Sequence, residues 1–110
     1  MNESYTAAVA RNERWQDDWA TEPYETAWAS EAIFFVRVLN REGPQAPVEA
    51  RVQISPDGMR WVDEGMRMTI AADAELAATK VSHFGGWLRL AGRCPRGTTL
   101  TVMAYLALKG

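Results

Sequence analysis

Hydrophobic and polar residues alternate in several short segments of this chain, most clearly over residues 48–54. Every second residue there is apolar and the residues between are polar, which predicts a strand with one buried and one solvent-facing side. The apolar positions are Val48, Ala50, Val52 and Ile54. This pattern predicts a β fold.

The residues that follow this strand predict a tight turn. Proline pre-sets φ at the second turn position, and glycine adopts the positive φ that closes a type I turn with a bulge. The turn residues are Ser55, Pro56, Asp57 and Gly58. We expect a β-hairpin in which Val62 lies opposite Val52, and Trp61 lies near Gln53 on the polar face.

Other segments predict further strands. Residues 33–39 are almost continuously apolar, with many β-branched and aromatic side chains, which predicts a central strand buried on both faces. Residues 100–108 alternate cleanly. Weaker strand signals occur over residues 5–9, 66–70, 76–84 and 87–91. Short strands at roughly ten-residue spacing are typical of an antiparallel β-sandwich, of the jelly-roll or immunoglobulin-like type.

The segment from Asn12 to Thr21 has no such pattern. Asn12 could cap a short helix that places Trp15 and Trp19 on one face, four residues apart, and an extended segment would also place both on one side. We expect a short N-terminal helix or loop here. No repeat or low-complexity tract divides the chain, so residues 1–110 are predicted to form a single β-sandwich domain.

Composition removes several classes of function. The 110 residues carry a net charge of −2 and 24% charged residues, so nothing favours binding to nucleic acid or to an anionic membrane. One cysteine and one histidine can form neither an internal disulfide nor a four-ligand zinc site, and we expect no metal and no cofactor. A polar N-terminus without an apolar leader predicts a protein that is cytoplasmic or incorporated in an assembly.

Candidate catalytic residues are few. His83 is the only histidine, and the adjacent Ser82 would point to the opposite face of a strand, so these neighbours cannot form a Ser–His pair. Cys94 lies between Arg93 and Arg96, whose charges would activate a thiol if they stayed close. A small buried cysteine before a proline is the simpler interpretation. We expect no enzymatic activity.

Tryptophan is unusually frequent, with five in the chain. Trp61 is predicted on a polar face near Arg51 and Asp63, where it is either covered by the Trp15–Trp19 segment or left available. An available ring would suit a partner protein or a sugar-stacking platform. The candidate contact residues of this kind are Trp61, Trp87 and Trp19.

The run from Gln53 to Trp61 resembles the Ser-x-Asp-Gly-x-x-Trp hairpin of discoidin-type β-sandwiches. This resemblance covers about fifteen residues, and it implies a sandwich whose loops bind glycans or lipid headgroups. The segments Phe84–Leu90 and Pro95–Gly97, with the last alternating strand, look like small bacterial and phage-type accessory sandwiches. That resemblance implies a role in decorating or joining larger assemblies.

Two functional hypotheses follow. The first is a non-enzymatic structural or interaction protein that forms a homo-oligomer or docks on a larger, virion-like assembly. The second face of the last strand supports it, because Met103, Tyr105 and Ala107 there are less polar than a solvated face should be. The alternative is a carbohydrate-binding module that uses exposed tryptophans on a glycan.

Overall fold

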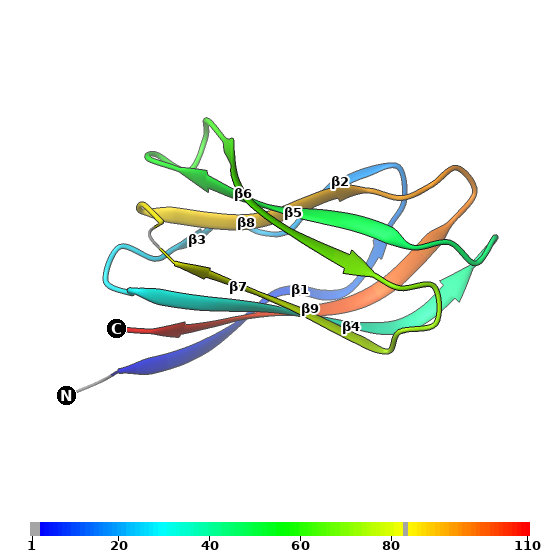
Figure 1. Cartoon of the computed structure of the whole chain (residues 1–110), viewed down its shortest axis with the longest axis horizontal. Helices are drawn as coiled ribbons and strands as arrows, with labels where there is room; N and C mark the ends of the chain where they lie inside the picture. Colours follow the sequence, from blue (N-terminus) through cyan, green and yellow to red (C-terminus); the bar gives the residue numbers. More distant parts are fainter. Residues whose placement is uncertain (1–2, 83) are drawn as a thin grey trace.

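The computed structural model describes residues 3–82 and 84–110 and consists of two antiparallel β-sheets packed face to face (Figure 1). The strands of the first sheet, in spatial order, are β1 (Ser4–Trp15), β9 (Thr99–Lys109), β4 (Glu31–Glu42) and β7 (Leu76–Ser82). The strands of the second are β2 (Asp18–Ala20), β8 (Trp87–Arg93), β5 (Val48–Ser55) and β6 (Val62–Ile70), with β3 (Tyr24–Glu25) also paired to β8. The predicted antiparallel β-sandwich is confirmed.

The connectivity distinguishes between the two sandwich types that the sequence allowed. Strands β2 and β3 both pair with β8, so together they occupy one interrupted strand position. With that position counted once, the strand orders β1-β9-β4-β7 and β2-β8-β5-β6 are those of a jelly roll. The fold is therefore of the jelly-roll type.

The core lies between the two sheets and is built by the alternating positions of their strands. The inward residues of β9 are fully buried, as the clean alternation of residues 100–108 predicted. Trp15 and Trp19 complete the core at the corner where β1 passes to β2; their rings stack with centroids 3.6 Å apart. The other large, fully buried side chains are Phe34, Ile70, Leu88, Leu90, Leu100, Leu106 and Leu108.

The expected N-terminal helix or loop is wrong, and the segment is mostly extended, which was the alternative. Within residues 3–82 and 84–110 no helix is present, and residues 12–20 belong mostly to β1 and β2. The pattern was hard to read because β1 contains register shifts after Ala8 and Ala10, and because Asn12 and Asp17 adopt positive φ values of 49° and 52°. Bulges and left-handed residues interrupt the period-two pattern without producing a helical one.

The expectation for β4 is confirmed in part. The strand is central, since it pairs with β9 on one side and β7 on the other. Only one of its faces is buried, however. Phe34 and Val36 are fully buried, whereas Ile33 and Phe35 on the opposite face are half-buried and Arg37 is exposed. Apolar residues occupy the middle of both faces, but among residues 3–82 and 84–110 no other strand packs over the outer one.

The β5–β6 hairpin has a wider loop than expected. Strand β5 ends at Ser55 and β6 begins at Val62, which pairs with Ile54 and not with Val52. The predicted register is therefore wrong, and Asp63, not Trp61, lies opposite Gln53. The positive φ expected for glycine is present: Gly58 has φ 79°.

Side-chain hydrogen bonds hold this loop. The Ser55 hydroxyl accepts hydrogen bonds from the backbone N–H groups of Asp57 and Gly58, and Asp57 Oδ1 accepts them from those of Met59 and Arg60. An aspartate that caps the next two or three amides is a strong local organiser of a turn. These bonds keep residues 59–61 out of the strand ladder, which explains the shifted register.

Asp57 makes the hairpin sensitive to acid. The backbone N–H groups of Arg60 and Met59 stabilise its carboxylate and lower its pKa from 3.8 to about 2. A carboxyl group whose pKa is lower in the folded state stabilises the fold above its unfolded pKa and loses that effect as the pH falls. We expect the melting temperature of the wild type to be higher than that of Asp57→Asn at pH 6. This difference should shrink as the pH falls from 4 to 2. A melting-temperature difference that is the same at pH 6 and pH 2 would contradict this.

Candidate interaction surfaces

The outer face of the four-stranded sheet is the first candidate surface. Because the inward positions of β1, β4, β7 and β9 are buried in the core, the residues between them project from the other side of this sheet. We call this surface the outer apolar face. Its uncharged residues are Thr6, Ala8, Ile33, Phe35, Ala78, Met103, Tyr105 and Ala107. One charged residue, Lys80 of β7, projects from the same side opposite Ile33.

Strand register brings the large side chains of this face together. Phe35 lies directly opposite Tyr105 on β9 and Ala78 on β7, and Ile33 lies opposite Ala107. Cross-strand neighbours on one face are close enough for aromatic and branched side chains to pack. Met103 and Tyr105, proposed from the sequence as contact residues, are thus joined by Phe35 and Ile33.

Sequence reasoning missed the contribution of β4 to this face. Its continuous apolar run predicts burial on both sides, but only one side is buried. The signal that could have shown the open face is the pair of charges that brackets the run at the same parity, Glu31 before Ile33 and Arg37 after Phe35. Charged residues at alternate positions mark a face that reaches solvent at its ends.

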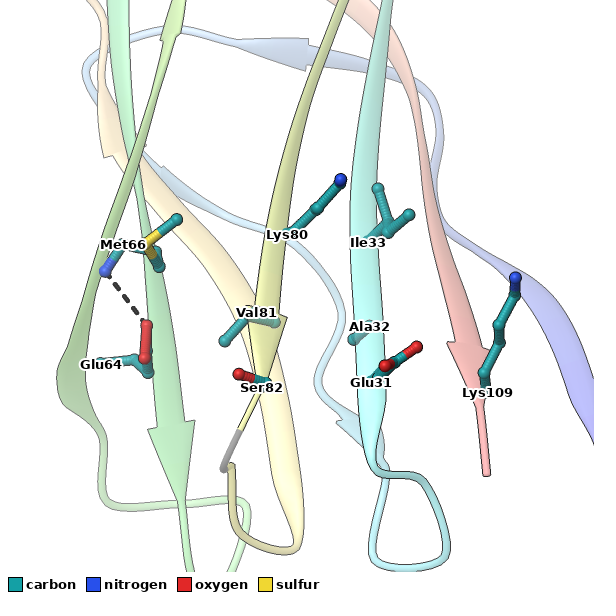
Figure 2. A pocket seen from close by; sticks show the side chains of 9 residues that line it. All are labelled: Glu31, Ala32, Ile33, Glu64, Met66, Lys80, Val81, Ser82 and Lys109. Carbon is teal, nitrogen blue, oxygen red and sulfur yellow. Dashed lines mark hydrogen bonds between the residues drawn. The ribbon is translucent and has the colours of Figure 1, made fainter. Parts of the chain in front are cut away.

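Two hollows open at one end of the outer apolar face. The larger has a volume of about 590 Å³ and the smaller about 240 Å³, and Glu31, Ala32, Ile33 and Lys109 line both. Figure 2 shows the larger one, between the ends of β4 and β7 and a kinked part of β6. A register shift in β6 between the residues paired to Arg51 and Gln53 brings Glu64 and Met66 to its rim.

The outer face of the five-stranded sheet is of the opposite character. Its side chains are mainly charged or amide-bearing, from Glu49, Arg51 and Gln53 on β5, Asp63 and Arg67 on β6, and Arg89 and Arg93 on β8. An antiparallel sheet with one apolar and one polar side is the ordinary arrangement in water. Only the four-stranded sheet departs from it.

The tryptophans proposed as contact residues lie in different environments. Trp19 is buried against Trp15, so it is no longer a candidate for ligand contact. Trp61 is half-buried on the polar outer face, where the guanidinium of Arg89 lies 4.3 Å from its ring centroid. The idea that the Trp15–Trp19 segment covers Trp61 is wrong, because those two rings belong to the core.

Trp87 is also half-buried, and its position is tied to the hairpin loop. It lies opposite Ser55 in the sheet, and a side chain placed at Gly58 would approach its ring to 3.2 Å. The ring therefore supports the loop from the β8 side. An exposed tryptophan that the sequence argument did not single out is Trp28, at 43% exposure.

Cys94, the candidate reactive residue that the structure describes, forms no reactive site. Cys94 is buried, donates a hydrogen bond to the carbonyl of Trp15 at 3.2 Å, and has a pKa raised mainly by burial. The hypothesis that Cys94 is an activated thiol is therefore wrong, and its interpretation as a small buried residue is confirmed. His83 lies outside the described residues. Within the part of the chain that the structure describes, no three His, Cys, Asp or Glu side chains are grouped to hold a metal ion.

Among the described residues, no helix is long and apolar enough to cross a membrane.

Solved structures with similar folds are distant in sequence. The PBSX exported protein XepA matches with a TM-score of 0.62 and 13% identity over 98% of this chain, which spans about a third (36%) of XepA. The SPBc2 prophage-derived protein YomS matches with a TM-score of 0.58 and 8% identity, over 100% of this chain and 96% of YomS. The infectious bursal disease virus Gx strain structure matches at 0.51 and 14% identity, over 100% of this chain and 32% of that one. At such identities these likenesses concern the fold alone.

No curated protein sequence matches the chain. The hairpin's resemblance to discoidin-type sandwiches stays a prediction. A family model described as a domain of unknown function, DUF6385, matches residues 25–106. This match covers most of the jelly roll, from the end of β3 into β9, and leaves out β1 and β2. The chain therefore belongs to the DUF6385 family.

Proposed function

We propose that this protein is a non-enzymatic assembly component that self-associates through the outer apolar face. The observation that carries the proposal is that the two central strands of the four-stranded sheet, β4 and β9, have apolar side chains on both sides, while Lys80 of the edge strand β7 borders them. An antiparallel sheet with one side in water alternates apolar and polar residues, as the five-stranded sheet does here. The fold likeness to a prophage-derived protein and to a viral structure fits such a role.

The charges around the face favour a second copy as the occupant. Along the outer side of β4 the order is Glu31, Ile33, Phe35, Arg37, with opposite charges at the two ends of an apolar pair. If two copies pack face to face about a two-fold axis between Ile33 and Phe35, their β4 strands run antiparallel. Glu31 of each copy then lies over Arg37 of the other, so the surface is self-complementary.

The size of the face sets the expected strength. Four strands about 4.8 Å apart and six residue steps of about 3.3 Å give a footprint on the order of 400 Å². Stable specific interfaces bury about 800 Å² on each partner. The dimer should therefore be weak, with dissociation in the micromolar range.

Replacing Phe35 by lysine tests this role of the face. Phe35→Lys puts a charge at the centre of the contact, and we expect the protein to stay monomeric at concentrations where the wild type dimerises. Val62→Lys is the matched control, because Val62 is 61% exposed on the other sheet. Mass measured by light scattering, with circular dichroism to confirm folding, gives the readout. Equal dimerisation of Phe35→Lys and wild type would contradict the proposal.

A second candidate function is glycan binding on the polar outer face. The observation that favours it is the half-buried Trp61, which lies beside hydrogen-bonding side chains on the five-stranded sheet. Aromatic rings with polar neighbours form sugar-binding platforms. This function uses the opposite side of the sandwich, so it is independent of self-association.

A further inference from the structure

Three arginines project from the outer face of the five-stranded sheet, one from each of the adjacent strands β5, β6 and β8. Arg51 on β5 lies directly opposite Arg67 on β6, and Arg89 on β8 lies opposite Gln53, the next outward residue of β5. Like charges directly opposite one another in a sheet are destabilising. Asp63 carries the one negative charge among them, and it accepts hydrogen bonds from both Arg51 and Gln53.

The hydrogen bonds leave part of this positive charge uncompensated. Arg51 Nε donates to Asp63 Oδ1 at 3.1 Å, and Gln53 Nε2 donates to the same oxygen at 3.0 Å. Arg89 Nε donates to Gln53 Oε1 at 2.8 Å, a neutral acceptor. Among the residues that the structure describes, neither Arg67 nor Arg89 forms an ion pair.

Arg89 is held where its charge is unfavourable. Partial burial, and secondly the charge of Arg51, lower its pKa. Its guanidinium stacks over the ring of Trp61, which fixes its direction. A fold that keeps the half-buried guanidinium of Arg89 near the charge of Arg51 favours an anion on this surface, because arginine forks match carboxylate geometry.

The remaining groups on this face select among anions. Asp63 and Glu49 are acceptors, so a ligand with only negative groups, such as a polyphosphate, would meet repulsion. A sugar acid has a carboxylate for the arginines and hydroxyls that can donate to these acceptors. Its apolar C–H groups can contact the part of the Trp61 ring that Arg89 leaves exposed.

We propose that the cluster of Arg51, Arg67 and Arg89, with Asp63 and Trp61, binds a carboxylated sugar such as a uronic acid residue of an acidic polysaccharide. This inference rests on the glycan-binding function proposed above and names its ligand class. The site lies on the opposite side of the sandwich from the outer apolar face.

Calorimetric titration of the full chain with trigalacturonate tests the proposal, with the fully methyl-esterified trisaccharide as a matched neutral probe. We expect trigalacturonate to bind at least tenfold more tightly than its ester. Equal binding of the ester would overturn the acid preference but leave glycan binding standing. Binding of neither probe would overturn this site and leave the glycan-binding function without support. Equal binding of triglutamate would overturn the assignment to a sugar.

Arg67→Gln is the informative variant because Arg67 is exposed and makes no ion pair within the described residues. We expect at least tenfold weaker binding of trigalacturonate without a lower melting temperature, since the change removes a like-charge contact. Arg96→Gln, in the loop after β8, is the control and should bind as the wild type does. Undiminished binding by Arg67→Gln, or a melting temperature that falls with binding, would overturn the role of this arginine.

Discussion

Gly92→Ala is expected to lower the free energy of unfolding by about 3 kcal/mol, the upper part of the usual range for overpacked cores. A Cβ at this position would lie 2.5 Å from the carbonyl oxygen of Glu49 and 2.5 Å from Trp19 Cζ2. Neither can move easily, because the carbonyl belongs to β5 and the Trp19 ring is stacked on Trp15. For a chain of this size the melting temperature should fall by about 10–20 °C.

Gly86→Ala is the matched control for this prediction. A Cβ there would lie 4.0 Å from its nearest neighbour, the carbonyl oxygen of Pro56, so the change should be nearly neutral. Thermal unfolding followed by circular dichroism compares the two variants, and the near-ultraviolet spectrum reports the tryptophan pair. If Gly92→Ala had the same melting temperature as the wild type, the close packing of Trp19 on β8 would be wrong.

Reversing one charge on β4 should weaken the dimer, and reversing both should restore it. In the antiparallel arrangement, Glu31→Arg places an arginine over Arg37 of the other copy, and Arg37→Glu places a glutamate over Glu31. The two-fold axis repeats each contact. Two contacts worth up to about 1 kcal/mol each predict a dissociation constant raised roughly 10- to 30-fold for either single variant.

The double variant Glu31→Arg/Arg37→Glu distinguishes the loss of charge pairing between the two copies from the loss of either native side chain. It regenerates two opposite-charge contacts, so its dissociation constant should return to within about threefold of the wild-type value. Both residues are exposed, but Glu31→Arg places an arginine opposite Lys109 of β9, so circular dichroism must confirm that each variant is folded before its mass is compared. A double variant as weak as the single variants would exclude the antiparallel arrangement about this axis.

The sequence predicted the sandwich well because most strands show their period plainly. Residues 100–108 and 48–52 alternate, and the structure buries the expected side of each. The N-terminal strands were missed because bulges in β1 and the left-handed Asn12 and Asp17 interrupt the pattern. Such irregularities depend on the sheet corner between β1 and β2, which local propensity does not encode.

The candidate surfaces were predicted only in part. The apolar second face of β9 was visible as Met103 and Tyr105, but its continuation through Ile33 and Phe35 depends on β4 pairing with β9. Pairing between two strands so distant in the sequence, Glu31–Glu42 and Thr99–Lys109, cannot be deduced from alternation alone. The arginine cluster was missed for the same reason, because Arg51, Arg67 and Arg89 come from three different strands.

Absolute mass by light scattering on a sizing column, across a concentration series of the wild type, tests the central claim most directly. Self-association through the outer apolar face predicts a mass that rises from the 12.3 kDa of the monomer toward twice that value, with a midpoint in the micromolar range. A mass that stays at 12.3 kDa up to high micromolar concentration would contradict it.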